Sequence, residues 1–272
     1  MSRGVKEQMD IRIFSYLPNP RIWKSTITAR LCGVNIDIRG AAPKELPGWL
    51  WDFDAHPLTD DERANSEAFA RTARTGFGGK LYKTDAFLEA NPFGTVPAAF
   101  SPDGSVGIFE SNSIMRTVAR LGASTRSLYG KDAFSASRID SFLDASLVFA
   151  RDSQIYLLAL NNDQITKDIH TRAHNALHTY LAGLNQALSP DRQYLVDDTL
   201  SIADICVVAE LALFSRERAC AQALEKVDCE CITGTQTDER YPFVTRHFES
   251  LCQHEAFAPD VLPYLATIAA KA

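Results

Sequence analysis

The chain has no long hydrophobic run, no excess of basic residues and no regular cysteine framework. No stretch reaches the roughly 18 apolar residues needed to span a bilayer, and the polar N-terminal segment MSRGVKEQMD has no apolar core of the signal-peptide kind. We therefore expect a cytoplasmic protein with no membrane partner. The formal net charge of −6 also argues against nucleic acid as a partner, because such a surface needs a basic stripe to displace counterions.

The cysteines and histidines show no metal or disulfide pattern. The six cysteines are irregularly spaced in a chain too long to need disulfide staples, so we expect free thiols in a reducing compartment. The close pair Cys229 and Cys231 is interpreted as incidental. His170, His174 and His178 repeat at one-turn spacing on a predicted helix, which could hold a metal. No carboxylate accompanies them, so we expect a solvated or core-edge stripe and no metal site.

What the chain does contain is an ordinary globular composition, 46% hydrophobic and 23% charged over 272 residues, which is enough for two domains. Near the N-terminus, residues 10–16 alternate like a half-buried strand, residues 21–32 fit a helix that ends at Gly33, and residues 34–38 predict a second strand. A strand, a helix and a strand of these lengths form a βαβ unit with parallel strands.

The later part of the chain has a different pattern. Residues 122–125 are a plausible linker, and long helices are predicted over 132–160 and 163–188, with little strand signal. The second half is therefore predicted to be all-helical.

The stretch over residues 91–121, NPFGTVPAAFSPDGSVGIFESNSIMRTVARL, carries the most information. It predicts a loop, a short strand over 95–100, a turn, a second strand over 107–109 and the start of an amphipathic helix. Pro97 near the start of a strand is tolerable where no ladder bond is needed, or where the peptide bond is cis. The free backbone N–H groups at the helix start favour an anionic group.

The motif Asn-Pro-x-Gly-x-Val-Pro, followed after a turn by Phe-Glu-Ser-Asn-x-Ile, resembles the glutathione-binding half of glutathione S-transferases. It is most similar to the transferase-like module of the gamma subunit of translation elongation factor 1. In that family, the peptide before a cis-proline pairs with the cysteinyl backbone of glutathione, and a Glu-Ser pair holds the γ-glutamyl end. The resemblance implies the first role for Thr95, Val96 and Pro97, and the second for Glu110 and Ser111.

The resemblance also implies an α/β plus all-α architecture. An N-terminal thioredoxin-like domain (βαβ-α-ββ-α) over residues 10–122 would be followed by an all-helical domain over 128–270. A short helix is expected over 81–90. Lys80 and Lys83 are close enough in sequence to reach the glycine carboxylate of glutathione, and the alternative, which is more common for lysine, is that they are solvated.

A long insertion at about 40–80 departs from the usual family pattern, because connections beyond about 15 residues are commonly functional or disordered. A helical run is expected from Thr59 to Arg74, followed by a flexible joint over 76–79. The insertion either folds over the glutathione site as part of the second-substrate pocket, or is an ornamental loop pinned by its aromatic residues or facing a partner subunit. Those residues are Trp49, Trp51, Phe53, Phe69 and Phe77.

In the family, the residue that activates the thiol of glutathione lies just after the first strand or at the start of the first helix. Here that loop carries Tyr16, Asn19 and Arg21 and no cysteine, which disfavours a glutaredoxin-like nucleophile. The chemistry requires a donor that stabilises the thiolate and so lowers the thiol pKa from about 8.5. Asn19 could donate its amide and Arg21 could add charge. The alternatives are a helix cap for Asn19, a solvated side chain for Arg21 and a core-facing strand residue for Tyr16.

A second family motif lies within residues 194–213. Ser201 and Asp204 have the spacing of a capping box, and Leu200 with Ile205 forms a hydrophobic staple. The pattern resembles the Ser/Thr-x-Ala-Asp motif at the core helix of the transferases. We interpret Ser201 and Asp204 as residues that serve folding rather than chemistry.

Together these features predict a glutathione transferase that uses glutathione as co-substrate and attacks a small hydrophobic electrophile. Conjugation, ether cleavage, dehalogenation and peroxide reduction share this framework, and the resemblance implies a homodimer with a role in detoxification. The alternative is a non-catalytic interaction module, as in the elongation factor subunit. The chain ends soon after the helical region, so we do not expect the additional domain of the full gamma subunit.

Overall fold

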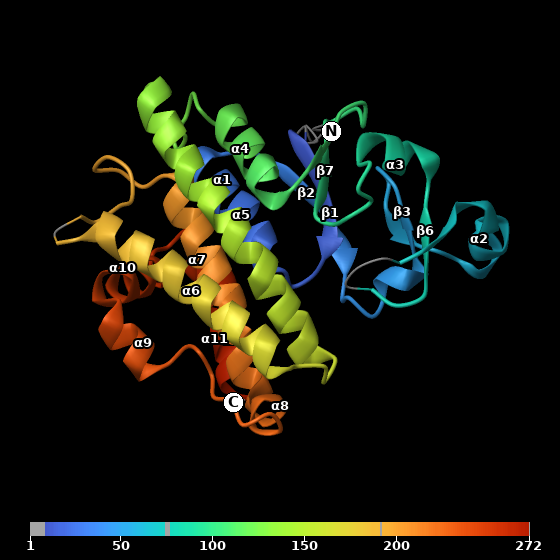
Figure 1. The fold of residues 1–272 in the computed structure, drawn as a ribbon. Coiled ribbons are helices and arrows are strands. Elements are labelled where there is room, and N and C mark those ends of the chain that lie inside the picture. Colours follow the sequence, from blue (N-terminus) through green and yellow to red (C-terminus); the bar gives the residue numbers. More distant parts are fainter. Residues whose placement is uncertain (1–8, 74–76, 191, 272) are drawn as a thin grey trace. The chain divides into compact units, whose positions relative to one another are not determined.

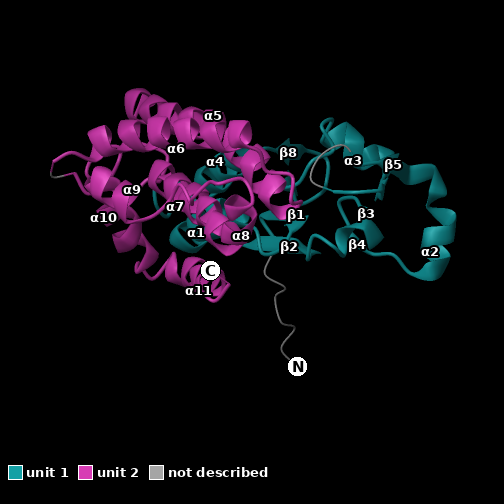
Figure 2. Ribbon diagram, turned by 60° about the horizontal axis from the view of Figure 1, so that its bottom comes forward, with its two compact units in different colours: residues 1–126 teal, residues 127–272 magenta. Residues whose placement is uncertain are grey.

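The computed structural model describes residues 9–73, 77–190 and 192–271. Its contacts divide the chain into two compact units, the first ending at Arg126 and the second beginning at Ser127 (Figure 2). The predicted joint over residues 76–79 and the end of the predicted helical run at Arg74 lie partly outside the described residues.

The first unit is built on a four-stranded sheet in the order β2-β1-β7-β8 (Figure 1). Strands β1 and β2 are parallel, and β7 is antiparallel to both β1 and β8. This confirms the predicted βαβ and ββα parts of a thioredoxin-like fold. Their bounds are β1 (Ile11–Tyr16), α1 (Pro20–Cys32), β2 (Ile36–Ala41), α3 (Asp85–Ala90), β7 (Ala98–Phe100), β8 (Gly107–Phe109) and α4 (Ser111–Leu121).

Helices α1 and α4 pack against this sheet through an aliphatic cluster. The sheet contributes Ile11 and Ile13 of β1 to this cluster, and the helices contribute Ile22 of α1 and Ile114 of α4. Helix α1 ends where Gly33 adopts φ 70° and its N–H bonds the Ala29 carbonyl, which is the glycine end signal expected from the sequence.

The insertion folds into a second four-stranded sheet, in the order β4-β3-β6-β5. Thr59 caps α2 with a capping box, but this helix ends after six residues and the chain continues through a short 3-10 turn into a strand. The predicted helical run from Thr59 to Arg74 is therefore wrong beyond Asn65. Residues 80–83 also form a strand, so the helix predicted over 81–90 begins only at Asp85, where Thr84 caps it. The bounds are β3 (Trp49–Trp51), β4 (His56–Pro57), α2 (Asp60–Asn65), β5 (Ala70–Thr72) and β6 (Lys80–Lys83).

An aromatic cluster joins the insertion to the first sheet. Trp51 is 1% exposed, lies edge-on to Phe14 of β1 and Phe87 of α3, and donates its indole N–H to the Leu46 carbonyl at 3.1 Å. Because burying rings of this size contributes a large share of core stability, the insertion is held against the first sheet by packing.

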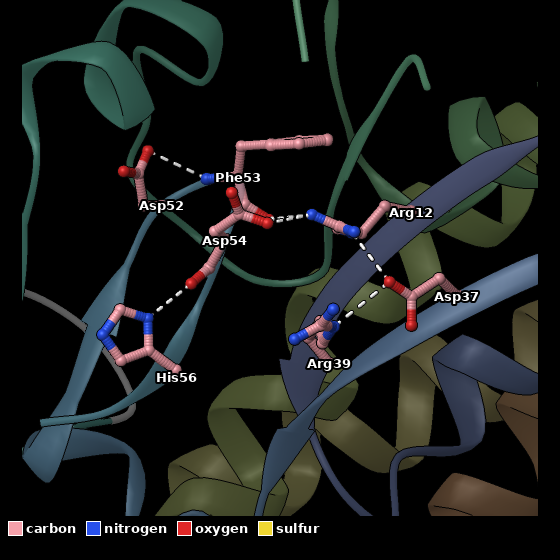
Figure 3. Close-up of polar contacts among 7 residues, drawn as sticks. All are labelled: Arg12, Asp37, Arg39, Asp52, Phe53, Asp54 and His56. Atoms are coloured by element: carbon pink, nitrogen blue, oxygen red, sulfur yellow. Dashed lines mark hydrogen bonds and ion pairs between the residues drawn. The ribbon is translucent and has the colours of Figure 1, made fainter. Parts of the chain in front are cut away.

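A polar contact continues this attachment on the same face (Figure 3). Arg12 of β1 donates to Asp37 of β2 at 2.8 Å and to the carboxylate of Asp54 in the insertion, and its guanidinium lies 4.2 Å from the centre of the Phe53 ring. Arg12 therefore connects the insertion to strands β1 and β2 of the main sheet.

The second unit is all-helical over its described residues. Helix α7 is apolar almost throughout, and nearly all of its residues are buried, so it forms the centre of this unit. The helices are α5 (Ala133–Asn161), α6 (Lys167–Leu188), α7 (Ile202–Phe214), α8 (Ala221–Glu225), α9 (Thr235–Arg240), α10 (Pro242–Cys252) and α11 (Ala258–Ala269).

Asp204 organises the start of α7. Its fully buried carboxylate accepts bonds from the backbone N–H and the hydroxyl of Ser201, from the Leu195 N–H and from His247 Nε2 at 2.9 Å. The predicted capping box is present, and the contacts with Leu195 and His247 extend it to two other segments of the unit.

Two of the three histidines of the predicted stripe have polar partners within the protein, and the third, His174, lies with its ring centre 4.2 Å from that of His178. His170 Nε2 lies 2.9 Å from the Glu230 carbonyl and His178 Nδ1 lies 3.0 Å from the Tyr241 hydroxyl.

The six cysteines are free thiols, and burial raises the pKa of Cys231 to about 11 and that of Cys252 to about 12. Within the described ranges, none of the helices has the length and apolarity required to cross a membrane.

Candidate functional site

The segments predicted to bind glutathione meet at one end of the main sheet. Phe14, near the end of β1, pairs with Ala98 at the start of β7, and Ala98 also pairs with Phe109 at the end of β8. Since the strands are antiparallel, the chain after β1, the chain before β7 and the chain after β8 emerge side by side. These are the three segments that carry Asn19, Val96-Pro97 and Glu110-Ser111, so the structure brings the predicted site residues to the same edge.

The loop before β7 is held in place by two side chains. The Val96-Pro97 peptide bond is cis, as the resemblance to glutathione transferases implied. The Asn91 side-chain amide donates to the Thr95 carbonyl at 2.7 Å, and Lys83 Nζ donates to the Gly94 carbonyl at 2.7 Å. Lys83 is therefore occupied with fixing this loop.

The three predicted loop residues differ in exposure. Thr95 is exposed, Val96 is half-buried and Pro97 is buried. Lys80, the other lysine considered for the glycine carboxylate, is paired with Glu67 on the surface.

The start of α4 is shaped to receive a charged group. Glu110 is exposed and has φ 68°, an uncommon backbone conformation for a residue with a side chain, and Ser111 follows as the first helical residue. Such conformations cost free energy and cluster at functional sites. The Ser113 and Ile114 N–H groups bond the Glu110 carbonyl, and the Ser111 N–H lies at the very start of the helix, where a carboxylate could accept a bond from it.

A buried lysine that the sequence did not reveal lies behind this helix start. Lys24 of α1 is 0% exposed, and its Nζ donates to Asn112 Oδ1 at 2.7 Å and to Ser111 Oγ at 3.3 Å. An ammonium group has only donors, so Ser111 Oγ must accept in this bond and can turn its own O–H toward a ligand. The only signal in the sequence was a lysine on a helix whose neighbours Trp23 and Ile27 are apolar.

The three candidates for thiol activation lie in different environments. Asn19 is 1% exposed; its Oδ1 accepts from the Arg21 N–H at 3.0 Å, and its Nδ2 donates to Ser15 Oγ at 3.1 Å. It is thus the cap of α1, although a side-chain amide has a second N–H to donate. Arg21 lies in the first turn of α1 and is half-buried. Tyr16 ends β1 and packs against the aromatic cluster that contains Trp51.

The same aromatic cluster reaches the loop before β7. Val96 packs against the buried cluster that contains Trp51, and Phe53 and Phe77 pack against the same cluster, so the insertion and the loop before β7 share one apolar cluster. Gly104, in the turn between β7 and β8, leaves room for the Phe53 ring, since a Cβ there would lie 3.0 Å from it. The insertion is therefore an integral part of the first unit and contacts the candidate site.

The arrangement has the parts needed to hold a γ-glutamyl peptide. An extended segment before β7 can pair with a peptide backbone, and the start of α4 can bind a carboxylate beside the Glu110 side chain, which suits an ammonium group. A thiol placed between these elements would lie near the start of α1, whose N–H groups and Arg21 favour a thiolate.

Known proteins with similar folds are glutathione transferases. A glutathione S-transferase from Methylobacillus flagellatus KT with glutathione bound superposes with a TM-score of 0.62 over 92% of this chain and 98% of its own, at 14% identity. A family member from Pseudomonas fluorescens Pf-5 with two glutathione molecules bound gives 0.63 over 95% of each chain, at 15% identity. At these identities the comparison establishes the glutathione transferase fold.

Sequence comparison finds two kinds of relative. Residues 139–255 match the glutathione S-transferase C-terminal domain. The chain is 34% identical over 137 residues to the probable elongation factor 1-gamma 1 of Arabidopsis thaliana, covering 50% of this chain and 32% of that protein. It is also 34% identical over 178 residues to elongation factor 1-gamma 1 of Oryza sativa subsp. japonica, covering 64% of this chain and 38% of that protein. The chain is therefore similar to glutathione S-transferases over its C-terminal part and to elongation factor 1-gamma, and it spans about a third of the length of these elongation factor relatives.

Proposed function

We propose that the chain is a glutathione transferase that binds glutathione at the end of its main sheet and transfers it to a small hydrophobic electrophile. The observation that carries the proposal is the meeting of Val96-Pro97 and Glu110-Ser111 at one sheet end, with Lys24 behind the helix start. Thr95 and Val96 pair with the cysteinyl backbone, Ser111 and the α4 N–H groups bind the γ-glutamyl carboxylate, and Glu110 binds its ammonium group.

The chemical step requires glutathione as its thiolate. Loss of the thiol proton to water is favoured by donors near the start of α1, where Arg21 supplies charge and Asn19 its remaining amide N–H. At an aryl halide or ether the thiolate then attacks carbon and forms a new C–S bond, while the halide or phenolate departs with the bonding electrons. At a hydroperoxide it attacks oxygen instead, so the O–O bond breaks and an alcohol is released after protonation. The insertion supplies one wall for the electrophile. The same proposal places the enzyme in the cytoplasm as a homodimer with a role in detoxification.

A specific observation favours a second candidate, a non-catalytic interaction module like that of elongation factor 1-gamma. The curated relatives described above are elongation factor subunits, and Asn19 is buried as a helix cap rather than displayed at the surface. A module of this kind would keep the fold and the capped loop without thiolate chemistry.

Turnover measurements separate the two functions. The purified chain should conjugate or cleave at least one member of a panel of aryl halides, aryl ethers and hydroperoxides in the presence of glutathione, and Arg21→Gln should lower kcat more than it changes the affinity for glutathione. Binding of glutathione without any turnover across the panel would favour the interaction module. Absence of glutathione binding would contradict the transferase proposal.

A further inference from the structure

A cavity of about 340 Å³ lies within the helical unit and is lined only by residues of that unit. Its walls come from α6, α7, α10 and α11, and from the segment around α9. Most of the lining is hydrocarbon, contributed by side chains such as Leu177, Leu181, Leu211, Phe214, Phe248 and Ile268. A volume of this size and an apolar lining with a few polar groups are typical of small-molecule sites.

Two of the three charged residues of the cavity lining are acidic. Asp238 of α9 and Glu249 of α10 both line it, and neither carboxylate accepts a hydrogen bond or forms an ion pair with another described residue. Arg218 is the single cationic residue of the lining, and its Nε donates to Thr233 Oγ1 at 3.2 Å. The charged groups therefore sum to one uncompensated negative charge.

Glu249 lies close enough to Asp238 to influence its pKa. Burial raises the pKa of Asp238, the nearby Arg218 opposes this effect and Glu249 adds to it. A carboxylate with a raised pKa is one whose negative charge is incompletely balanced by its surroundings. A cation placed between Asp238 and Glu249 would supply that balance.

We propose that this cavity binds a small hydrophobic amine in its ammonium form. The hydrocarbon part lies against Leu177, Leu211 and Ile268, and the ammonium group donates to Asp238 and Glu249 at the opening. An ammonium has three N–H donors, which suits two carboxylates with free oxygen atoms. An anionic head group in the same place would face both carboxylates with only Arg218 to offset them.

Three probes of equal chain length test the proposal on the full chain: octylamine, octan-1-ol and octanoate. Calorimetry at low salt should show saturable 1:1 binding of octylamine, about tenfold tighter than octan-1-ol, with octanoate the weakest. The double variant Asp238→Asn, Glu249→Gln should bind octylamine no more tightly than octan-1-ol and leave octan-1-ol binding unchanged. Glu239→Gln is the matched control, because Glu239 is exposed on α9 but does not line the cavity.

Three outcomes overturn the proposal. They are tighter binding of octanoate than of octylamine, no saturable binding of any probe, or an equal loss of octylamine binding in the Glu239→Gln control. The double variant should keep its affinity for glutathione, because both changed residues lie in the helical unit and neither belongs to the sheet-end site. Failure of glutathione binding and failure of amine binding are therefore separate results.

Discussion

Lys24 is a fully buried lysine in a position where an exposed one would be expected. Its Nζ bonds Asn112 and Ser111 at the start of α4, so the positive charge lies behind the site proposed for the γ-glutamyl carboxylate. Removing an ammonium from water is costly, and the group is retained where its bonds serve a purpose. We infer that Lys24 positions the Ser111 hydroxyl and adds positive potential at this helix start.

The pairing of Lys24 with Ser111 leads to a double-mutant prediction. Lys24→Met keeps the length of the side chain and removes the charge, and it should weaken glutathione binding about tenfold, as should Ser111→Ala. Because both changes remove the same interaction, the double variant should bind little worse than either single variant, a coupling of about 1 kcal/mol by calorimetry. Additive losses would show that Lys24 does not act through Ser111.

Asp204 gives a prediction about stability. Asp204→Ala leaves four buried donors, from Leu195, from the backbone and hydroxyl of Ser201 and from His247, without their acceptor, so the unit should lose about 3 kcal/mol of unfolding free energy. Chemical denaturation measures the loss, and Asp198→Ala, on the exposed part of the same loop, should change stability little. Glutathione turnover lost at unchanged stability would contradict the folding role of Asp204.

His178 makes stability depend on pH. Burial lowers its pKa below 6.5, with His174 and Arg240 adding to the effect, so the unfolded chain takes up a proton more readily than the folded one. The folded state should therefore be most stable above pH 6.5 and lose stability as the pH falls through the lower pKa of the folded protein. Denaturation curves from pH 8 to 5 should show a shallower decline for His178→Gln, and an unchanged decline would contradict this assignment.

At the scale of elements, the close contact between β1 and β2 at Ser15 and Gly40 lies at the end of the sheet that carries the candidate site. Gly40 has φ 158°, and a Cβ there would lie 1.9 Å from the Ser15 carbonyl oxygen, a backbone atom that cannot move aside. Gly40→Ala should therefore destabilise the first unit by about 3 kcal/mol and weaken glutathione binding. Gly78→Ala, where a Cβ meets nothing within 4 Å, is the matched control and should leave the melting temperature nearly unchanged.

The main sheet could be predicted because its signals are local. The alternation in 10–16, the Gly33 stop and the turn before 107–109 each act over a few residues, and the structure places β1, α1 and β8 there. The capping box at Ser201 was likewise readable, since its two side chains are three residues apart.

The fold of the insertion could not be predicted because its strands pair with segments that are distant in the sequence. Its strands have two to four residues, and β3 pairs with β6 across a stretch of about thirty residues, so the pairing leaves no periodic pattern in the sequence. The local sequence favoured a helix after Thr59, but residues 70–72 pair with β6 and form a strand instead. Lys24 was missed for a similar reason, since only the fold shows that its face of α1 is buried.

At the scale of the whole molecule, the chain combines a sheet unit that carries the candidate glutathione site with a helical unit that carries a separate cavity. The fold of both units resembles that of glutathione transferases, but the fold does not decide chemistry, because one fold can serve as an enzyme or as a binding module. The deciding property is whether the sheet end binds glutathione through the residues assigned to it.

The most direct test is a calorimetric titration of glutathione into the full chain and into the double variant Glu110→Gln, Ser111→Ala. We predict saturable binding by the unaltered chain and at least a tenfold loss of affinity in the variant, while Glu89→Gln, an exposed change on α3, binds normally. No binding by the unaltered chain, or equal binding by the double variant at unchanged stability, would contradict the assignment of this site.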